Sequence, residues 1–287
     1  MAVGFFDSIH LGHQKVIMEA CRLAKSRGTT SSVFLFKNNI FELIGVNKTP
    51  LFSFEDRLKF IEALGVDKVF YINATKDFLA LSPSEFISFI SRKLAIDGIV
   101  CGNDFSFGRN GEGKASDLLK YFPSSKVVDL SLLNGEKIST SFLKTALQSG
   151  EMDTAKEILG RNFTFVGKVI EGRKDGKKMG FPTVNMHFPT GVMKAGVYVT
   201  ESVVNGERYD SLTNVGGHPT YGDNSENAET YLLDYCGDLY GTKVEIIFLS
   251  YLREIKKFDS VDSLVLQIEK DVKKRREYDT VRTIGNR

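Results

Sequence analysis

The sequence predicts an α/β chain with two domains: a mainly parallel sheet flanked by helices, followed by a small antiparallel β-barrel with a terminal helix. A length of 287 residues is sufficient for two hydrophobic cores. In the first half, apolar strand-like runs alternate with segments of helical periodicity, which favours a doubly wound parallel sheet. In the second half, short β-rich runs are separated by glycine, asparagine and aspartate turns, as in a small barrel. We therefore expect domains at 1–150 and 160–287.

The first half contains the strand and helix signals in strict alternation. Ser82-Pro83-Ser84-Glu85 is a capping box with proline at the first helical position. Ligands of such a sheet bind beyond the carboxyl ends of its strands, where His10 and the loop after Cys101 would lie. Strands are expected at Ala2–Phe6, Ser32–Phe36, Val66–Ile72, Ile99–Gly102 and Val127–Leu130, and helices at Leu11–Ser26, Phe54–Leu64, 83–95 and Ala115–Tyr121.

The second half begins after a helical segment that we interpret as polar, Thr145–Leu159, with Gly150 and Gly160 as its stops. A last helix over Val261–Arg275 should cover the barrel with one apolar face, and the basic run 273–276 is interpreted as a solvated helix end. The barrel strands are expected around Phe163–Ile170, Val197–Val204, Tyr231–Tyr235 and Val244–Leu249, and the covering face consists of Val261, Leu264, Val265 and Ile268.

Composition excludes several classes of protein. The 38 basic and 36 acidic residues give a net charge of +2 and are mixed along the chain, so neither nucleic acid nor a membrane surface is an expected partner. Cys21, Cys101 and Cys236 have no spacing typical of a metal site or disulfide framework, and we interpret them as reduced core residues. No signal peptide and no apolar run of roughly 18 residues is found. We expect a cytoplasmic monomer or weak homo-oligomer.

The segment Gly176–Asn185 has the residues needed to hold a phosphate and its metal. Its glycines allow close approach of the backbone to a ligand, and Pro182 restricts the turn. Thr183 and Asn185 lie two apart and so face the same side of an extended segment. Their oxygens suit Mg²⁺, which usually arrives with nucleotide phosphates. The alternative is a lysine-rich hairpin turn that ends in an edge strand.

The loop Gly4–His13 lies between a predicted strand and a predicted helix. It directs backbone N–H groups and the imidazoles of His10 and His13 toward one point, which is typical of an anion site. The His-x-x-His spacing also permits a metal, but no third ligand is evident nearby. Gly108–Lys114 fits a P-loop pattern, which we reject because Ala115 cannot bind magnesium and no strand is predicted immediately before it.

The C-terminal half resembles the riboflavin kinases. Gly180-Phe181-Pro182-Thr183-Val184-Asn185 is similar to their glycine-rich loop and Pro-Thr-Ala-Asn motif, with Val184 in place of alanine. The resemblance implies a catalytic base at Glu229, which by chemistry alone would be an ordinary turn acid. The resemblance continues at Gly196, Asn214, Pro219, Asp234, Arg253 and 267–271. It implies that Gly172, Lys178 and Gly180 bind ATP, that Thr183 and Asn185 bind Mg²⁺, and that Asn214 and Arg253 bind the flavin.

The N-terminal half resembles the nucleotidyltransferase superfamily, whose two signature histidines bind ATP phosphates, so a Rossmann-like nucleotidyltransferase domain is implied. Ser8 stands where the family usually has glycine. The loop 102–109 is similar to a segment of bacterial flavin adenylyltransferases, which implies flavin contacts from Asp104 and Phe105. The matching signature residues, which imply adenylyl transfer and ATP binding, are Gly4, Phe6, Asp7, His10, Gly12 and His13.

Two further segments depart from that family. Ile138–Lys144 falls where relatives carry Ile-Ser-Ser-Thr-x-x-Arg, so Ser139, Ser141 and Lys144 are implied phosphate ligands. Lys144 keeps the charge of the arginine but not its bidentate fork. The segment 36–39, Phe-Lys-Asn-Asn, lacks the His-Pro pair that relatives place on the flavin side.

The whole chain thus resembles the prokaryotic bifunctional riboflavin kinases/FMN adenylyltransferases. The resemblance implies that riboflavin and ATP give FMN, and that FMN and ATP then give FAD and pyrophosphate, with Mg²⁺ as cofactor. One alternative is a kinase with a degenerate N-terminal domain. Another is a flavin- or nucleotide-binding regulator without turnover. Adenylyl transfer alone would require a defective kinase site, whereas Thr183, Asn185 and Glu229 are all present.

Overall fold

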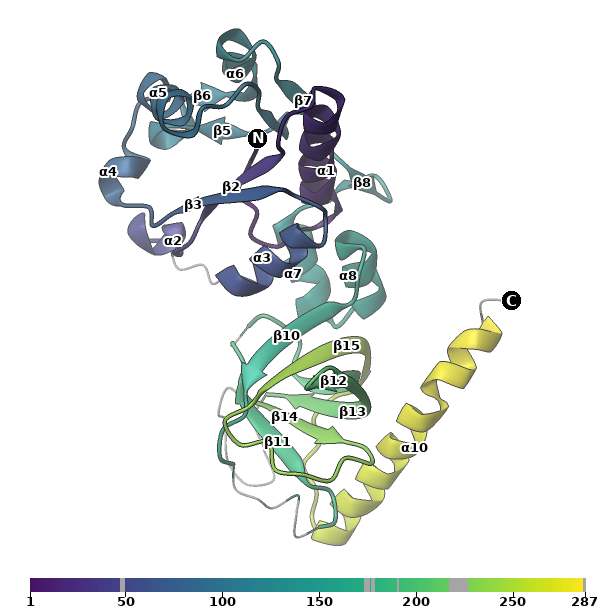
Figure 1. The fold of residues 1–287 in the computed structure, drawn as a ribbon. Coiled ribbons are helices and arrows are strands. Elements are labelled where there is room, and N and C mark those ends of the chain that lie inside the picture. The colour runs from purple at the N-terminus through teal and green to yellow at the C-terminus, as the bar shows by residue number, and fades with distance from the viewer. Residues whose placement is uncertain (47–49, 173–175, 177–178, 190, 217–226, 286–287) are drawn as a thin grey trace. The chain divides into compact units, whose positions relative to one another are not determined.

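The computed structural model describes the chain except residues 47–49, 173–175, 177–178, 190, 217–226 and 286–287, and except the side chains of 280–285. The chain divides into two compact units, Met1–Phe142 and Leu143–Arg287 (Figure 1). Each unit is built around a sheet of its own.

The first unit contains a five-stranded sheet with the order β3-β2-β1-β4-β7, in which every pairing is parallel. The predicted parallel sheet is confirmed. The chain builds outward from β1 in one direction and then returns to its other side, so the order reverses between β1 and β4, where doubly wound sheets bind ligands. The strands are β1 (Ala2–Val3), β2 (Ser32–Phe36), β3 (Lys68–Ile72), β4 (Val100–Gly102) and β7 (Lys126–Val128).

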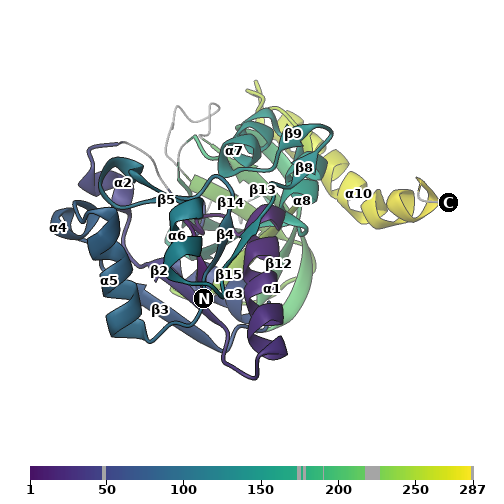
Figure 2. The ribbon, with the colours of Figure 1, turned by 90° about the horizontal axis from the view of Figure 1, so that it is seen from above.

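Helices cover both faces of this sheet (Figures 1 and 2): α1 and α3 pack on one side and α5 and α6 on the other. The predicted caps are present, since Ser53 accepts from the Asp56 N–H at 3.1 Å and Ser82 forms the capping box with Glu85. The helices are α1 (Leu11–Ser26), α2 (Ile40–Leu43), α3 (Phe54–Glu62), α4 (Lys76–Leu79), α5 (Pro83–Leu94) and α6 (Ala115–Tyr121). The short helices α2 and α4 were not predicted.

Several local predictions, most of them in the first unit, were wrong. Strand β1 ends at Val3 rather than Phe6, because the chain leaves the sheet in a turn that joins the Asp7 N–H to the Phe5 carbonyl at 2.8 Å. Strand β7 ends at Val128 rather than Leu130. Of the supposed core cysteines, Cys101 is buried, but Cys21 is half-buried and Cys236 is exposed.

The segment that fits a P-loop pattern is a small hairpin. Strand β5 (Ser106–Phe107) does precede it, so that ground for rejecting a P-loop was wrong. The hairpin continues through a 3-10 turn at Arg109–Gly111 into β6 (Gly113–Lys114), and the Lys114 ammonium donates to the Gly111 carbonyl at 2.8 Å. Because the lysine lies in an antiparallel strand, the segment does not form a phosphate loop. A second hairpin joins β8 (Leu132–Leu133) to β9 (Glu136–Lys137).

The second unit contains an antiparallel sheet with the order β10-β15-β12-β13-β14-β11, curled into a half-barrel (Figure 1). A single bridge between Ile170 and Asn185 joins the chain after β10 to β11. The strands are β10 (Phe163–Lys168), β11 (Thr183–His187), β12 (Gly196–Val204), β13 (Glu207–Val215), β14 (Asn227–Leu232) and β15 (Lys243–Arg253). Strand β14 begins earlier and ends earlier than predicted, and the left-handed Asp234 (φ 59°) lies in the turn that follows it.

Two helices precede the half-barrel, α7 (Thr140–Ser149) and α8 (Met152–Leu159). They are followed, as predicted, by Gly150 and Gly160 in the left-handed region (φ 78° and 69°), where a side chain would be strained. The interpretation of this segment as polar was wrong, because α8 packs against β10 and β15. Its buried residues are Leu147, Met152, Ala155, Ile158 and Leu159.

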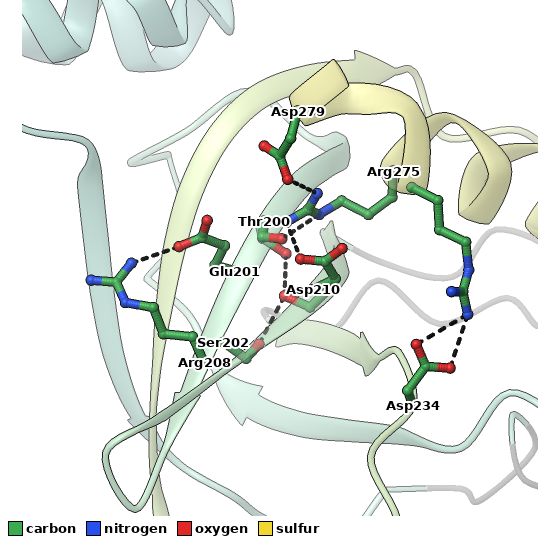
Figure 3. A network of polar contacts seen from close by, with 10 residues as sticks. Thr200, Glu201, Ser202, Arg208, Asp210, Asp234, Arg275 and Asp279 are labelled. Carbon is green, nitrogen blue, oxygen red and sulfur yellow. Dashed lines mark hydrogen bonds and ion pairs between the residues drawn. The ribbon is translucent and has the colours of Figure 1, made fainter. Parts of the chain in front are cut away.

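The last helix, α10 (Val261–Gly285), is longer than predicted. The interpretation of the basic run 273–276 as a solvated helix end was wrong for Arg275, which is 0% exposed and donates to the Thr200 carbonyl at 2.9 Å and to the Asp210 carboxylate at 2.6 Å (Figure 3). The other three residues of the run are exposed, but the helix continues beyond them to Gly285. Of the predicted covering face, Val261 is 57% exposed, whereas the other three residues are half-buried. A buried arginine is rare without such partners.

Candidate active sites

The first unit has a cavity of about 340 Å³ at the carboxyl ends of β1, β4 and β7. It lies at the reversal of strand order, as predicted for a ligand site. The structure therefore brings together the loop after β1, the loop after β4 and the start of α7. Predicted site residues that line it are Gly4, Phe6, Asp7, His10, Gly12, His13, Asp104, Phe105 and Ser139.

His10 and His13 stack at the start of α1, with ring centroids 3.7 Å apart and planes at 16°. The His10 Nδ1 accepts the His13 backbone N–H at 3.1 Å, so a neutral His10 carries its proton on Nε2. A Cβ at Gly12 would lie 3.1 Å from the His10 ring, so glycine makes room for this stack. In the described part of the chain, the buried Nδ1 of His13 has no hydrogen-bond partner in the protein, so it is available to water or to a bound ligand.

Both imidazoles are neutral near pH 7. Burial lowers the pKa of His10 to about 3, reinforced by the neighbouring His13 and opposed by Asp7. Burial likewise lowers the pKa of His13 to about 3. The histidines can therefore offer N–H donors to an anion, while the positive charge at this cavity comes from Lys137, which also lines it.

These lowered pKa values should make stability depend on pH. The unfolded chain binds protons on these histidines below about pH 6.5, whereas the folded protein does not until about pH 3. Stability should therefore fall as the pH is lowered from 6.5 toward 3. We expect urea unfolding between pH 5 and 6.5 to show this slope, and the variant His10→Ala/His13→Ala to show less of it. An equal slope in both proteins would contradict the burial of neutral imidazoles.

Thr140 ties the start of α7 to the loop after β1. Its hydroxyl donates to the Asp7 carboxylate at 2.6 Å and lies 2.9 Å from the Ser8 hydroxyl. Ser8 is completely buried, and the left-handed residue of this turn is Ile9 (φ 47°) rather than Ser8. The replacement of glycine by Ser8 is therefore accommodated without strain at that position. Sequence reasoning missed Thr140, although it stands between the two serines that were chosen.

The other predicted phosphate ligands of this region differ in position. The Ser139 hydroxyl accepts the Phe142 N–H at 3.1 Å and caps the first turn of α7 beside the cavity. Ser141 is exposed, and Lys144 belongs to the second compact unit. The structure thus brings Ser139 to the cavity and gives no such position for the other two.

An ion pair between Asp104 and Lys137 lies at the wall of the cavity, and Phe105 stacks on Phe107 with centroids 5.9 Å apart. Lys137 was missed by sequence reasoning. The only available signal was a cation next to the Ile138-Ser139 segment, and its proximity to Asp104 depends on the β8–β9 hairpin. A phosphate that enters the cavity would compete with Asp104 for this ammonium.

The segment without the His-Pro pair has structural roles. Asn38 forms two hydrogen bonds with the backbone of Ala74, at 3.0 and 2.8 Å. Asn39 caps α2 by accepting the Phe41 N–H at 3.2 Å. Asn38 therefore joins the loop after β2 to the loop after β3, whereas Asn39 acts within its own loop.

In the second unit, Thr183, Asn185 and Glu229 meet across the β11–β14 pair. Asn185 lies directly opposite Glu229, and the Thr183 hydroxyl donates to the Glu229 carboxylate at 2.5 Å. Asn214 lies opposite Glu229 on the other side. Residues opposite one another in neighbouring strands share a face, so these four polar side chains lie on one face of the sheet.

Gly172 and Gly176 lie close to this face. A Cβ at Gly172 would lie 2.2 Å from the Asn185 amide, and one at Gly176 would lie 2.4 Å from the Phe181 carbonyl. Gly180 adopts a φ of 86°, which explains its presence in the turn before Pro182. The predicted Lys178 and the landmark Pro219 lie outside the described residues.

Comparison with known proteins assigns the two halves. The family model for FAD synthetase matches residues 1–142, and the model for riboflavin kinase matches residues 159–279. A bifunctional riboflavin kinase/FMN adenylyltransferase of Listeria monocytogenes is 35% identical over 94% of this chain and 89% of its own, and the Bacillus subtilis protein of that description is 34% identical with the same coverage. The chain belongs to this bifunctional family.

A solved structure shares the fold of this family member over nearly its whole length. It is described as a macrolide-efflux protein from Streptococcus pneumoniae, with a TM-score of 0.86, 26% identity and coverage of 96% of this chain and 93% of that one. Efflux is the description of that protein alone. Among the described residues, no helix combines the length and apolar character needed to cross a membrane.

The donor set of the kinase half fits Mg²⁺ brought by a nucleotide. The hydroxyl of Thr183 and the amide oxygen of Asn185 are hard ligands on one face of β11, and phosphate oxygens and water complete such sites. No group of three or more His, Cys, Asp or Glu side chains suited to a metal occurs in the described ranges. A preformed all-protein metal cage is therefore not seen there.

Arg253, the other predicted flavin ligand of the kinase half, is held by α10. Its Nε donates to Asp271 at 2.8 Å, and its second terminal nitrogen lies 2.7 Å from the same carboxylate oxygen. The remaining carboxylate oxygen accepts from Gln267 at 2.9 Å. The landmarks at 253 and 267–271 are therefore one cluster in space.

Proposed function

We propose that this protein makes FAD from riboflavin in two ATP-dependent steps, with the kinase step in residues 160–287 and the adenylyl transfer step in residues 1–150. The observation that carries this proposal is the presence of both sets of polar groups in one chain. A stacked, neutral His10–His13 pair lines a cavity at the sheet edge, and Glu229 stands beside Thr183 and Asn185 on a separate sheet.

In the kinase step, Glu229 takes the proton of the primary hydroxyl of riboflavin while that oxygen bonds to the γ-phosphorus of ATP and the bond to ADP breaks. Thr183 and Asn185 would hold Mg²⁺, which when bound neutralises phosphate charge. The Thr183 hydroxyl donates its proton to Glu229, so its lone pairs remain available to a metal. Gly172, Lys178 and Gly180 belong to the proposed ATP loop, and Asn214 and Arg253 to the flavin site.

In the adenylyl transfer step, a phosphate oxygen of FMN bonds to the α-phosphorus of ATP and pyrophosphate leaves. The attacking phosphate is already ionised, so no general base is required. His10 and His13 donate N–H groups to phosphate oxygens at the start of α1, and Lys137 supplies charge. Asp104 and Phe105 are assigned to FMN, and Ser139 to the phosphates. For Ser141 and Lys144, the proposed role at the phosphates rests on the family resemblance alone.

The substrates proposed for this chain are riboflavin, FMN and ATP, with Mg²⁺ as cofactor and FMN and FAD as products. A cytoplasmic location and a monomer or weak homo-oligomer complete the proposal. Neither nucleic acid nor a membrane takes part in it.

A time course tests the function. The purified protein is incubated with riboflavin, ATP and Mg²⁺, and the flavins are separated by chromatography. FMN followed by FAD is the expected result. FMN that never becomes FAD would restrict the function to the kinase, and flavin binding without ATP consumption would favour a regulator.

A further inference from the structure

The contact between β15 and α10 is a buried ion pair with well-aligned partners. Asp271 is 2% exposed, and the Arg253 side chain is 16% exposed. One oxygen of Asp271 receives two nitrogens of the guanidinium, and the other is occupied by Gln267. The third guanidinium nitrogen donates to the Glu254 carbonyl at 3.0 Å. The orientation of Arg253 is thus determined chiefly by one carboxylate on another element.

Arg253 lies on the same face of the half-barrel as the proposed kinase residues. Arg253 of β15 pairs with Val197 of β12. Val197 in turn pairs with Asn214 of β13, and Asn214 pairs with Glu229 of β14. Since neighbouring strands are about 4.8 Å apart, Arg253 lies about 10 Å from Asn214 along this row. A flavin whose ribityl hydroxyl reaches Glu229 can extend its fused rings along the row. A guanidinium held by its edge can present its flat side to an aromatic ring.

A second anchor of α10 lies one turn further along the helix. Arg275 follows Asp271 by four residues and therefore projects from the same side of the helix. It contacts Thr200 of β12 and Asp210 of β13 rather than β15 (Figure 3). Asp271 and Arg275 thus contact different partners on the sheet, and either contact can be changed without removing the other.

We propose that Asp271 is a positioning residue for riboflavin phosphorylation, which acts by holding Arg253 in the orientation that binds the flavin ring. This inference rests on the proposed kinase function. The anchor at Arg275 docks the helix and has no part in flavin binding. The role of α10 in the site is therefore local to the turn that carries Gln267 and Asp271.

The test compares Asp271→Asn with Asp210→Asn. The first substitution keeps the shape of the side chain but removes its charge, so it weakens the charge-assisted hydrogen bonds that hold Arg253. We expect the riboflavin KM, and the riboflavin Kd from flavin fluorescence without ATP, to rise about tenfold or more. The KM for ATP and the conversion of FMN to FAD should not change. Asp210→Asn removes a partner of Arg275 and should lower Tm without raising the riboflavin KM.

Arg253→Lys provides a second variant that keeps the positive charge but loses the fork. It should reproduce the loss of riboflavin affinity, and its combination with Asp271→Asn should add little because both act on one contact. Parent-like riboflavin affinity in Asp271→Asn or in Arg253→Lys would overturn the proposal. An equal rise in riboflavin KM in Asp210→Asn would also overturn it, because helix docking alone would then explain the effect. If the parent protein itself forms no FMN, the proposed function fails, whereas the fluorescence comparison still reports on Asp271.

Discussion

Glu229→Gln should abolish the conversion of riboflavin to FMN and leave the conversion of FMN to FAD at the parent rate. General-base catalysis contributes about 10²–10⁴-fold, so the kinase rate should fall by at least about 100-fold. The glutamine carbonyl can still accept the Thr183 hydroxyl, which now donates to Glu229 at 2.5 Å. The loss would therefore report on the proton acceptor rather than on a displaced Thr183. Each step is measured separately, with riboflavin and ATP or with FMN and ATP.

Glu245→Gln is the matched control for this experiment, because Glu245 is another strand glutamate of the same sheet, on β15 opposite Val166. It should leave both reactions unchanged. Riboflavin phosphorylation at the parent rate in Glu229→Gln would remove this residue from its assigned role. Loss of both reactions would indicate misfolding, which the Tm of the variant would reveal.

His10→Ala combined with His13→Ala should silence adenylyl transfer alone. Loss of one preorganised donor at a developing charge costs about 10²–10³-fold in rate, and this variant removes two. The stacked rings also fill space against Phe6, whose ring centroid lies 5.3 Å from that of His13. Because adenylyl transfer is lost while the kinase step remains, FMN should accumulate from riboflavin without FAD. The measurement is FAD formation from FMN and ATP.

His187→Ala is the control for the histidine pair, since His187 is exposed on β11 in the second unit and should not affect adenylyl transfer. A double variant that still makes FAD at the parent rate would rule out the phosphate-binding assignment. The two single variants should differ in stability. The His10 ring also accepts the His13 backbone N–H, so His10→Ala should weaken the start of α1 as well.

The burial of Arg275 could not be predicted from the sequence. Arg275 was read as part of a solvated run, yet it is completely buried between α10 and the sheet. Its partners Thr200 and Asp210 are 75 and 65 residues away in sequence. The partner within one helical turn is Asp279, at 3.3 Å, and an i,i+4 pair of this kind is typical of an exposed helix surface, so the local pattern is that of an exposed arginine.

Features that depend on neighbours in sequence were predictable. The cap at Ser53, the capping box at Ser82 and the glycine stops at Gly150 and Gly160 were all confirmed, because each is decided by contacts within about four residues. The parallel sheet followed from the alternation of strand and helix. The end of β14 was missed because the left-handed Asp234 is decided by the turn rather than by apolar pattern.

By itself the sequence determined the two-part α/β architecture, the family and nine of the residues that line the first cavity, because these depend on short motifs and on periodicity. Only the tertiary structure decided that Thr140 binds Asp7, that Lys137 pairs with Asp104 and that Asp271 holds Arg253. The two members of these pairs are 133, 33 and 18 residues apart in sequence, which is beyond the reach of a local motif. Which partners meet is set by the packing of whole helices and strands, and that packing is a property of the folded chain rather than of any local pattern.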